Sequence, residues 1–144
     1  MNKTTARKLL YGYLESPVAK ALAHLGLSPN LITVIGLVIA GVSAYLLGIG
    51  LLLFGGLVLL LSGVFDILDG AVARETGHTT QFGALLDSTI DRASEGLVLL
   101  GLLVYFLDKA SSLEVMLAYL ALAGSFLVSY VRARAEGLGV ECTV

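Results

Sequence analysis

The chain has 144 residues, of which 57% are hydrophobic and 14% are charged, and its mean hydropathy is +0.91. A composition this apolar excludes an ordinary soluble domain of the same length and is typical of a helical integral membrane protein. The formal net charge is −2, and we expect no nucleic-acid partner.

The first segment, residues 3–26, combines apolar residues at helical spacing with a basic face. Its lysine and arginine positions are Lys3, Arg7, Lys8 and Lys20. This pattern predicts an amphipathic helix on the cytoplasmic membrane surface, kinked at Pro17. A plain juxtamembrane helix without a ligand role is favoured, because basic helices beside a membrane are common.

Four apolar stretches follow, and each is long enough for a membrane-spanning helix. No charged residue occurs between Lys20 and Asp66, and the segment Leu27-Ser28-Pro29-Asn30 is a signal for a turn and a helix start. The predicted spans cover about residues 31–48, 53–74, 82–107 and 113–136. The predicted fold is therefore all-α, with a juxtamembrane helix over residues 1–28 and a single membrane domain over 1–144.

The basic residues also predict the orientation of the spans. Arg74 ends the second span, and Arg132 and Arg134 end the fourth, whereas the opposite loops contain only Lys109. Because basic residues concentrate on the cytoplasmic side, the N-terminus, the 75–81 loop and the C-terminal end are expected to face the cytoplasm.

Four aspartates interrupt the second and third predicted spans near their cytoplasmic ends. They form the pairs Asp66 and Asp69, spaced i, i+3, and Asp87 and Asp91, spaced i, i+4. Each spacing puts both carboxylates of a pair on one helix face. The two helices are joined by a short loop, so the pairs are predicted to face each other at a similar depth.

These carboxylates require an explanation, since each acid in a span costs on the order of 2.5–3.5 kcal/mol. The nearby cations are Arg74 and Arg92. Divalent cations would neutralise the group, and all-oxygen ligands suit Mg²⁺ or Mn²⁺ better than Ca²⁺ here. Four carboxylates suffice for two ions, a number that suits phosphoryl-type transfer. The alternative is a hydrated cavity or ion pathway without chemistry, which the two matched pairs disfavour.

The residues around the aspartates resemble a known family. The pattern Asp66-x2-Asp69-Gly70-x2-Ala73-Arg74-x8-Gly83-x3-Asp87-x3-Asp91 matches the CDP-alcohol phosphotransferase signature without a departure, and Pro29-Asn30-x2-Thr33 also resembles that family. The resemblance implies a membrane enzyme, often dimeric, that moves a substituted phosphate from a CDP-linked donor to an alcohol and releases CMP. Family members have six spans, so the four predicted here resemble a truncated family fold.

The resemblance also implies roles for individual residues. Two Mg²⁺ ions, or Mn²⁺, would be held by Asp66, Asp69, Asp87 and Asp91, and Asp91 would also be the general base. Gly70 would allow close approach of the cytidine group, and Arg74 would pair with the diphosphate. The residues implied to bind the donor, CDP-diacylglycerol, are Asn30, Leu31, Ile32, Thr33, Gly70, Ala73, Arg74, Thr80 and Gly83.

The residues at the end of the fourth predicted span indicate the acceptor. The segment from Ser129 to Glu136 resembles the phosphatidylinositol phosphate synthase branch of the family, whose acceptor is inositol phosphate. Arg132 is the first candidate to bind the acceptor phosphate and Arg134 the second; alternatively, both only mark the cytoplasmic end of a span. Glu95, one turn beyond Asp91, either orients a substrate hydroxyl or pairs with a neighbouring arginine.

The expected function is transfer of a phosphatidyl group from CDP-diacylglycerol to inositol phosphate, at a multi-pass site that faces the cytoplasm from the plasma membrane. Glycerol phosphate, serine or another alcohol remain alternative acceptors. A divalent-cation carrier or channel subunit is an alternative of another class, but it would not need Gly70 or Arg74 at these offsets. A non-catalytic remnant that binds partners is a third possibility. The expected associations are the lipid bilayer and a second copy of the chain.

Overall fold

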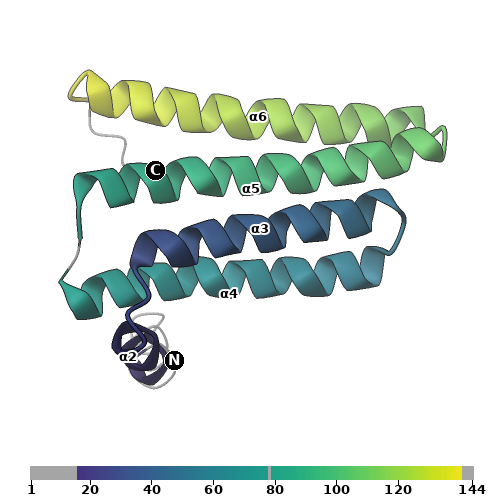
Figure 1. Cartoon of the computed structure of the whole chain (residues 1–144). Helices are drawn as coiled ribbons and strands as arrows, with labels where there is room; N and C mark the ends of the chain where they lie inside the picture. Colours follow the sequence, from purple (N-terminus) through teal and green to yellow (C-terminus); the bar gives the residue numbers. More distant parts are fainter. Residues whose placement is uncertain (1–15, 78, 141–144) are drawn as a thin grey trace, which may run out of the picture.

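The computed structural model describes residues 16–77 and 79–140, and every regular element within these ranges is a helix. The helices are α2 (Ser16–His24), α3 (Pro29–Gly48), α4 (Leu52–Thr76), α5 (Gln81–Asp108) and α6 (Ser112–Gly137). Figure 1 shows α3 to α6 lying side by side in alternating directions, with α2 crossing one end of the bundle. The all-α fold predicted from the sequence is confirmed.

The ends of the helices follow from capping chemistry that the apolar pattern alone does not contain. Ser28 caps α3 by accepting a hydrogen bond from the backbone N–H of Leu31 at 3.3 Å. Thr80 caps α5 by accepting one from the N–H of Gly83 at 2.9 Å. Gly77 ends α4 in the left-handed conformation, with φ +67°. Each helix therefore extends slightly beyond the apolar stretch that predicts it.

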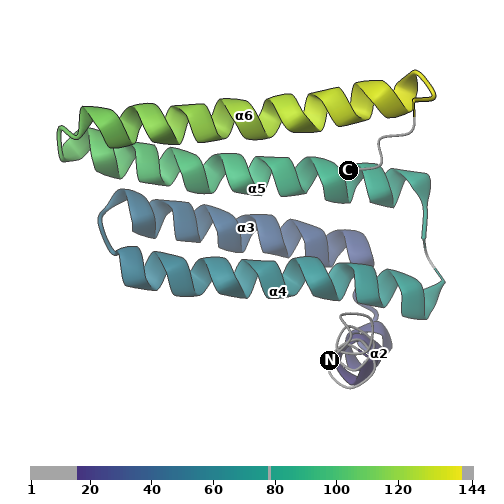
Figure 2. The same ribbon diagram turned by 180° about the vertical axis from the view of Figure 1, so that it is seen from behind.

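Three of the long helices, α3, α4 and α6, are long and apolar enough to cross a membrane. Helix α5 has 28 residues, but charged residues between Asp87 and Glu95 interrupt its apolar character. It lies alongside the other three in Figures 1 and 2, and it coincides with the third predicted span, residues 82–107; we therefore treat it as a membrane span as well.

The centre of the bundle is α3, which packs closely against both α4 and α5. A Cβ atom on Gly101 of α5 would lie 2.2 Å from the carbonyl oxygen of Ala44, so the two backbones meet where only glycine fits. On the other side, Ser62 of α4 donates a hydrogen bond to the carbonyl oxygen of Gly36 at 2.9 Å. Small residues on α3 thus hold α4 and α5 on either side of it.

This arrangement differs in one respect from the expectation that the second and third spans pack directly together. Among the described helices, α4 and α5 do not form one of the close helix pairs; α3 contacts both instead. The glycine and serine contacts on α3 explain the difference, because they let α3 approach both neighbours more closely than α4 and α5 approach each other. The two aspartate pairs therefore lie on helices that do not pack closely against each other.

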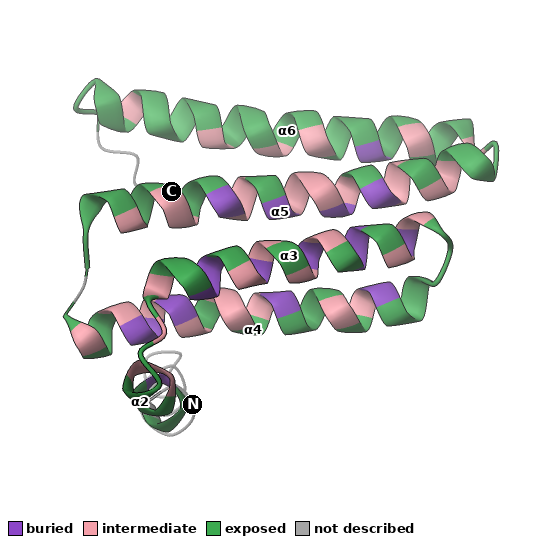
Figure 3. Cartoon of the chain, viewed as in Figure 1, coloured by how far each residue is buried: buried purple, intermediate pink, exposed green. Residues whose placement is uncertain are grey.

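Helix α6 is attached to the bundle through α5. Figure 3 shows that most of its surface is exposed, and Ala118 is the one buried residue within Ser112–Gly137. Large apolar side chains such as Leu117, Leu127 and Val131 are more than half exposed. Such a surface is typical of a helix that meets lipid or further membrane helices.

Helix α2 packs across the end of the bundle. Ala19 is 1% exposed and lies in a core cluster with Ile32, Ala71 and Val72, and Nζ of Lys20 lies 3.7 Å from Oε1 of Glu75. This is the described part of the predicted surface helix. The rest of that prediction, including Lys3, Arg7 and Lys8, lies outside the described residues.

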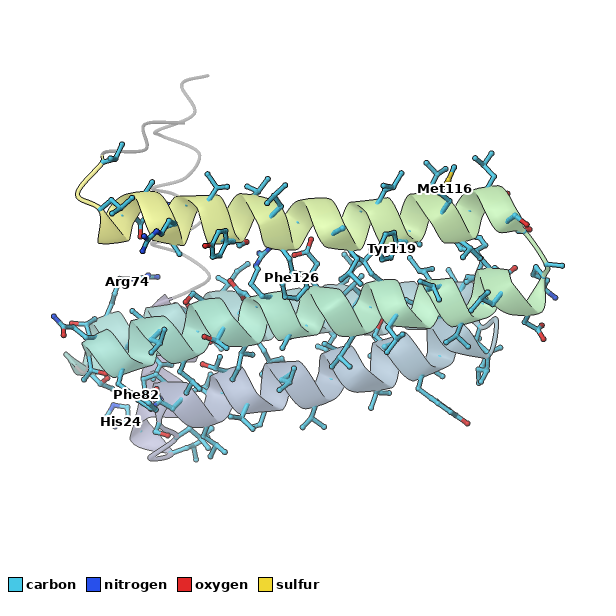
Figure 4. The ribbon with its side chains drawn as sticks, turned by 90° about the horizontal axis from the view of Figure 1, so that it is seen from above. His24, Arg74, Phe82, Met116, Tyr119 and Phe126 are labelled. Atoms are coloured by element: carbon cyan, nitrogen blue, oxygen red, sulfur yellow. The ribbon has the colours of Figure 1, made fainter. Side chains whose placement is uncertain are left out.

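The alternating directions of the helices gather four helix ends beside α2. The starts of α3 and α5 and the ends of α4 and α6 lie at this end of the bundle, as the two opposite views in Figures 1 and 2 agree. In Figure 4, Arg74 and Phe82 lie there as well, whereas Met116 lies at the far end. The end of α4, which carries Arg74, therefore lies at the same end of the bundle as α2.

Candidate active site

The four aspartates form one electrostatically coupled group, hereafter the aspartate group: Asp66 and Asp69 of α4, and Asp87 and Asp91 of α5. Asp91 repels both aspartates of α4, and Asp87 interacts with the other three. Asp69 is buried, with 4% of its surface exposed, and the others are half-buried. These interactions place the two pairs near each other, although α4 and α5 are not among the closely packed helix pairs of the described chain.

Helix α3 holds the α4 pair in place. The hydroxyl of Thr33 donates a hydrogen bond to Oδ2 of Asp69 at 2.6 Å and lies 3.0 Å from the carbonyl oxygen of Pro29. One turn further along, Oδ1 of Asp66 lies 3.1 Å from the position that a Cβ on Gly36 would occupy. Thr33 and Gly36 are i, i+3 on one face of α3, which gives each acid of the α4 pair its own contact.

The aspartate group has the right ligand chemistry for a divalent cation, but its side chains are not arranged around a common point. Within residues 16–77 and 79–140, no three His, Cys, Asp or Glu side chains converge closely enough to hold a metal ion as they stand. The four carboxylates nevertheless offer only oxygen ligands, which hard divalent cations prefer, and their mutual repulsion favours a cation between them. Binding an ion would require these side chains to turn toward a common point.

A pocket of about 200 Å³, hereafter the Asn30 pocket, opens beside Asp69 and Asp87. The start of α3, the last turns of α4, the 79–80 loop and the start of α5 enclose it. Its lining residues are Pro29, Asn30, Thr33, Asp69, Gly70, Ala73, Arg74, Thr79, Thr80, Gly83, Ala84 and Asp87. Seven of the nine residues predicted to bind the donor line this pocket.

The other two, Leu31 and Ile32, do not line it. Leu31 is 46% exposed, and Ile32 is 1% exposed in the core cluster with Ala19. Helical spacing explains this difference, because Asn30 and Thr33 share a face of α3 that the two intervening residues do not. A contact of Leu31 or Ile32 with the donor stays a prediction. Thr79 and Ala84 also line the pocket, but they are not among the predicted donor residues. Thr79 directly precedes the predicted Thr80, so its position next to Thr80 was the one indication in the sequence.

Gly70 and Arg74 lie together at one side of the Asn30 pocket. A Cβ on Gly70 would lie 3.4 Å from a terminal guanidinium nitrogen of Arg74, so glycine leaves the space beside this cation open. The positive charge of Arg74 also acts on Asp69. The pocket therefore combines a cation, hydroxyl groups and carboxylates within one end of the bundle.

A second and larger hollow lies between α4 and α5, on the other side of the aspartate group. This groove of about 780 Å³ is lined mostly by apolar side chains, and it contains Asp66, Asp91, Arg92 and Glu95. Asp69 and Asp87 thus line the Asn30 pocket, while the other two aspartates line the groove. The aspartate group stands between two separate hollows, which suits a reaction between two substrates.

The candidate acceptor residues lie apart from both hollows. Arg132 and Arg134 are exposed and line neither the Asn30 pocket nor the groove. Nε of Arg132 donates to Oε1 of Glu136 at 3.2 Å. Two roles were predicted for Glu95, and in the structure it forms an ion pair with Arg92. Ser125 of α6 is hydrogen-bonded to both residues.

The sequence profile of the CDP-alcohol phosphatidyltransferases matches residues 26–142. The chain belongs to this family. An uncharacterised protein of Aquifex aeolicus is 42% identical over 137 residues, which are 95% of this chain and 70% of that protein. The phosphatidylinositol phosphate synthase of Mycolicibacterium smegmatis is 41% identical, over 91% of this chain and 60% of its own length. The archaetidylinositol phosphate synthase of Pyrococcus horikoshii is 39% identical, over 85% and 62%.

Solved structures of the phosphatidylinositol phosphate synthase of Mycobacterium tuberculosis have the same fold. The complex with CDP-DAG superposes with a TM-score of 0.83 at 38% identity, and the match covers 88% of this chain and 64% of that one. The complex with manganese and citrate gives a TM-score of 0.80 and covers 61% of that chain. The family member described here is thus an all-α membrane protein that spans about three fifths of the length of its named relatives.

Proposed function

We propose that this chain transfers a phosphatidyl group from CDP-diacylglycerol to an alcohol acceptor, for which inositol phosphate is the first candidate, and releases CMP. The main support for this proposal is the Asn30 pocket, where seven of the predicted donor-binding residues lie beside Asp69 and Asp87. Relatives support the substrates: the M. tuberculosis phosphatidylinositol phosphate synthase has been solved with CDP-DAG bound, and the other named relatives are a phosphatidylinositol phosphate synthase and an archaetidylinositol phosphate synthase.

In this proposal the donor head group occupies the Asn30 pocket. Arg74 pairs with the diphosphate through its planar fork of N–H donors. Gly70 leaves room for the cytidine group, and the polar groups of Asn30, Thr33 and Thr80 provide hydrogen-bonding partners. The acyl chains remain in the bilayer, because the pocket lies beside apolar helix surfaces that a membrane would cover.

Two divalent cations held by Asp66, Asp69, Asp87 and Asp91 would stabilise charge on the diphosphate and make CMP a better leaving group. Mg²⁺ is the expected ion; Mn²⁺ remains the alternative, and manganese is present in a relative. Asp91 lines the groove, from which it would take the proton of the acceptor hydroxyl. The acceptor oxygen then forms a bond to phosphorus as the bond from that phosphorus to the CMP oxygen breaks.

Arg132, and secondarily Arg134, would bind the acceptor phosphate. Positive charge at these two residues favours an anionic acceptor, such as inositol phosphate or glycerol phosphate, over serine or a cationic amino alcohol. When the acceptor phosphate binds Arg132, it would replace Glu136 as the partner of this side chain. Losing the Glu136 contact costs little, because an exposed ion pair contributes only about 0–1 kcal/mol.

We further propose that residues 1–144 form a single multi-pass membrane domain in the plasma membrane, with the aspartate group toward the cytoplasm. Arg74 lies near the end of α4, and Arg132 and Arg134 lie near the end of α6. Figure 1 shows these two helix ends on the same side of the bundle, which supports this orientation. Association into a homodimer is proposed from the family resemblance alone.

The test is CMP release by the chain in lipid nanodiscs that contain CDP-diacylglycerol and Mg²⁺ or Mn²⁺. Inositol phosphate, glycerol phosphate, serine and inositol are offered in turn, and CMP release with inositol phosphate is expected to be fastest. If CMP release is faster with another alcohol, that alcohol is the acceptor and the assignment of inositol phosphate is wrong. If no acceptor gives CMP, while the chain carries divalent cations into liposomes, the carrier alternative is correct instead.

A further inference from the structure

Helices α5 and α6 are connected by a polar cluster of three side chains, hereafter the triad: Arg92 and Glu95 of α5 and Ser125 of α6. A terminal nitrogen of Arg92 donates to the Ser125 hydroxyl oxygen at 2.9 Å, and that hydroxyl donates to Oε2 of Glu95 at 2.6 Å. Arg92 and Glu95 also form an ion pair with each other. One serine of α6 thereby binds both members of an ion pair on α5.

Apolar contacts accompany the triad where α6 packs on α5. Near the triad, the ring of Phe126 lies 3.6 Å from the position of a Cβ on Gly96, a contact between apolar atoms and a smooth glycine surface. Figure 4 shows Phe126 between the two helices. Apolar contacts of this kind tolerate sliding and rotation, whereas hydrogen bonds from one hydroxyl to two fixed partners do not.

The triad has a geometric consequence for the proposed acceptor residue. Arg132 follows Ser125 by seven residues, which is about two turns or roughly 10 Å along α6 and nearly the same face. The helices are antiparallel, so the same distance along α5 from residues 92–95 reaches residues 85–88. Helical spacing therefore puts Arg132 about level with Asp87 and nearly on the face of α6 that carries Ser125, with 74% of its side chain exposed.

We propose that the triad is a positioning device that holds α6 in register on α5 and so places Arg132 at the depth of the aspartate group. Arg92, Glu95 and Ser125 act through Arg132 and need not touch a substrate. The effect on acceptor binding rests on the proposed function, whereas the effect on helix register does not.

The register is tested without activity by spin labels on two exposed positions, Leu85 of α5 and Val131 of α6, each replaced by cysteine in a chain whose Cys142 is changed to serine. Ser125→Ala is expected to broaden or shift the distance distribution between the labels. Ser125→Thr, which keeps the hydroxyl, and Ser112→Ala, at the opposite end of α6, are expected to leave it unchanged. An unchanged distribution in Ser125→Ala overturns the proposal.

The kinetic test uses the same three variants in nanodiscs. Ser125→Ala is expected to raise KM for inositol phosphate roughly three- to tenfold, the scale of one inter-helix hydrogen bond, with KM for CDP-diacylglycerol unchanged. Ser125→Thr should restore the parent value, and Ser112→Ala should match it. An equal rise in both KM values would mean a general structural role and overturn the assignment. If the parent chain releases no CMP, the proposed function fails, and the label distances still decide the register.

Discussion

Asp69 and Asp91 occupy different surroundings in the structure. Asp69 is buried and accepts a hydrogen bond from Thr33, whereas Asp91 is half-buried and lines the open groove. A group that must receive a proton from an incoming hydroxyl needs access to that substrate, and a group that holds a cation needs a fixed orientation. The difference in environment supports separate roles for the two carboxylates.

Asp91→Asn is expected to lower turnover by about 10²–10⁴-fold, the scale of losing a general base. Donor binding should survive, because Asp91 does not line the Asn30 pocket. CMP release and CDP-diacylglycerol binding are measured in the same nanodisc preparation. Normal turnover in this variant would remove the base assignment.

Thr33→Val removes the hydroxyl that orients Asp69 while keeping nearly the same side-chain volume. We expect Mn²⁺ affinity to fall by roughly 10–100-fold, as is usual when a metal ligand loses its supporting hydrogen bond. Thr33→Ser is the matched control and should bind Mn²⁺ like the parent. Free Mn²⁺ followed by electron paramagnetic resonance reports this directly, and equal affinity in the valine variant would contradict a supporting role for Thr33.

At the scale of helices, α3 is the element on which the site depends, because it contacts both helices that carry aspartates. The backbones of α3 and α5 touch at Gly101 and Ala44, far from the aspartate group. Since rigid helices transmit an enforced separation along their length, a change at this contact is expected to alter the distance between α5 and the α4 pair.

Gly101→Ala would place a Cβ 2.2 Å from the carbonyl oxygen of Ala44 and must force α3 and α5 apart. We expect a loss of about 1–3 kcal/mol in the free energy of unfolding, the usual cost of overpacking. Gly41→Ala on α3 is the control, since nothing lies within 4 Å of its added Cβ. Unfolding in detergent by a mild denaturant gives both values, and equal stability of the two variants would be the contrary result.

At the scale of the whole molecule, four carboxylates gather at one end of an apolar bundle without converging on a common point. A ligand that binds the folded chain and not the unfolded one stabilises the fold in proportion to its saturation. The carboxylates come from both α4 and α5, so a cation between them would join the two sides of the bundle that α3 separates.

Mn²⁺ at 100 times its dissociation constant is therefore expected to stabilise the chain by about 2.7 kcal/mol, and a chelator should reverse the effect. The measurement is thermal unfolding in nanodiscs with and without the ion. Asp69→Asn should weaken the shift, while Asp108→Asn, at the far end of α5, should keep it. A shift of equal size in both variants would mean that the ion acts elsewhere.

The sequence by itself determined the features that depend on local periodicity: four long helices, the shared face within each aspartate pair, and the family signature from Asp66 to Asp91. Rise per residue and side-chain period are the same in every α-helix, so spacing along the chain converts directly into depth and face. Even Arg92 and Glu95 were readable as a candidate pair, because they lie three residues apart.

Only the tertiary structure decided what lies between elements. It showed that α3 separates α4 from α5, that Ile32 belongs to the core and not to the Asn30 pocket, and that Ser125 completes the cluster on α5. These features arise from contacts between residues far apart in the chain. Such contacts depend on how closely small side chains let backbones approach, and no periodicity within a single helix contains that information.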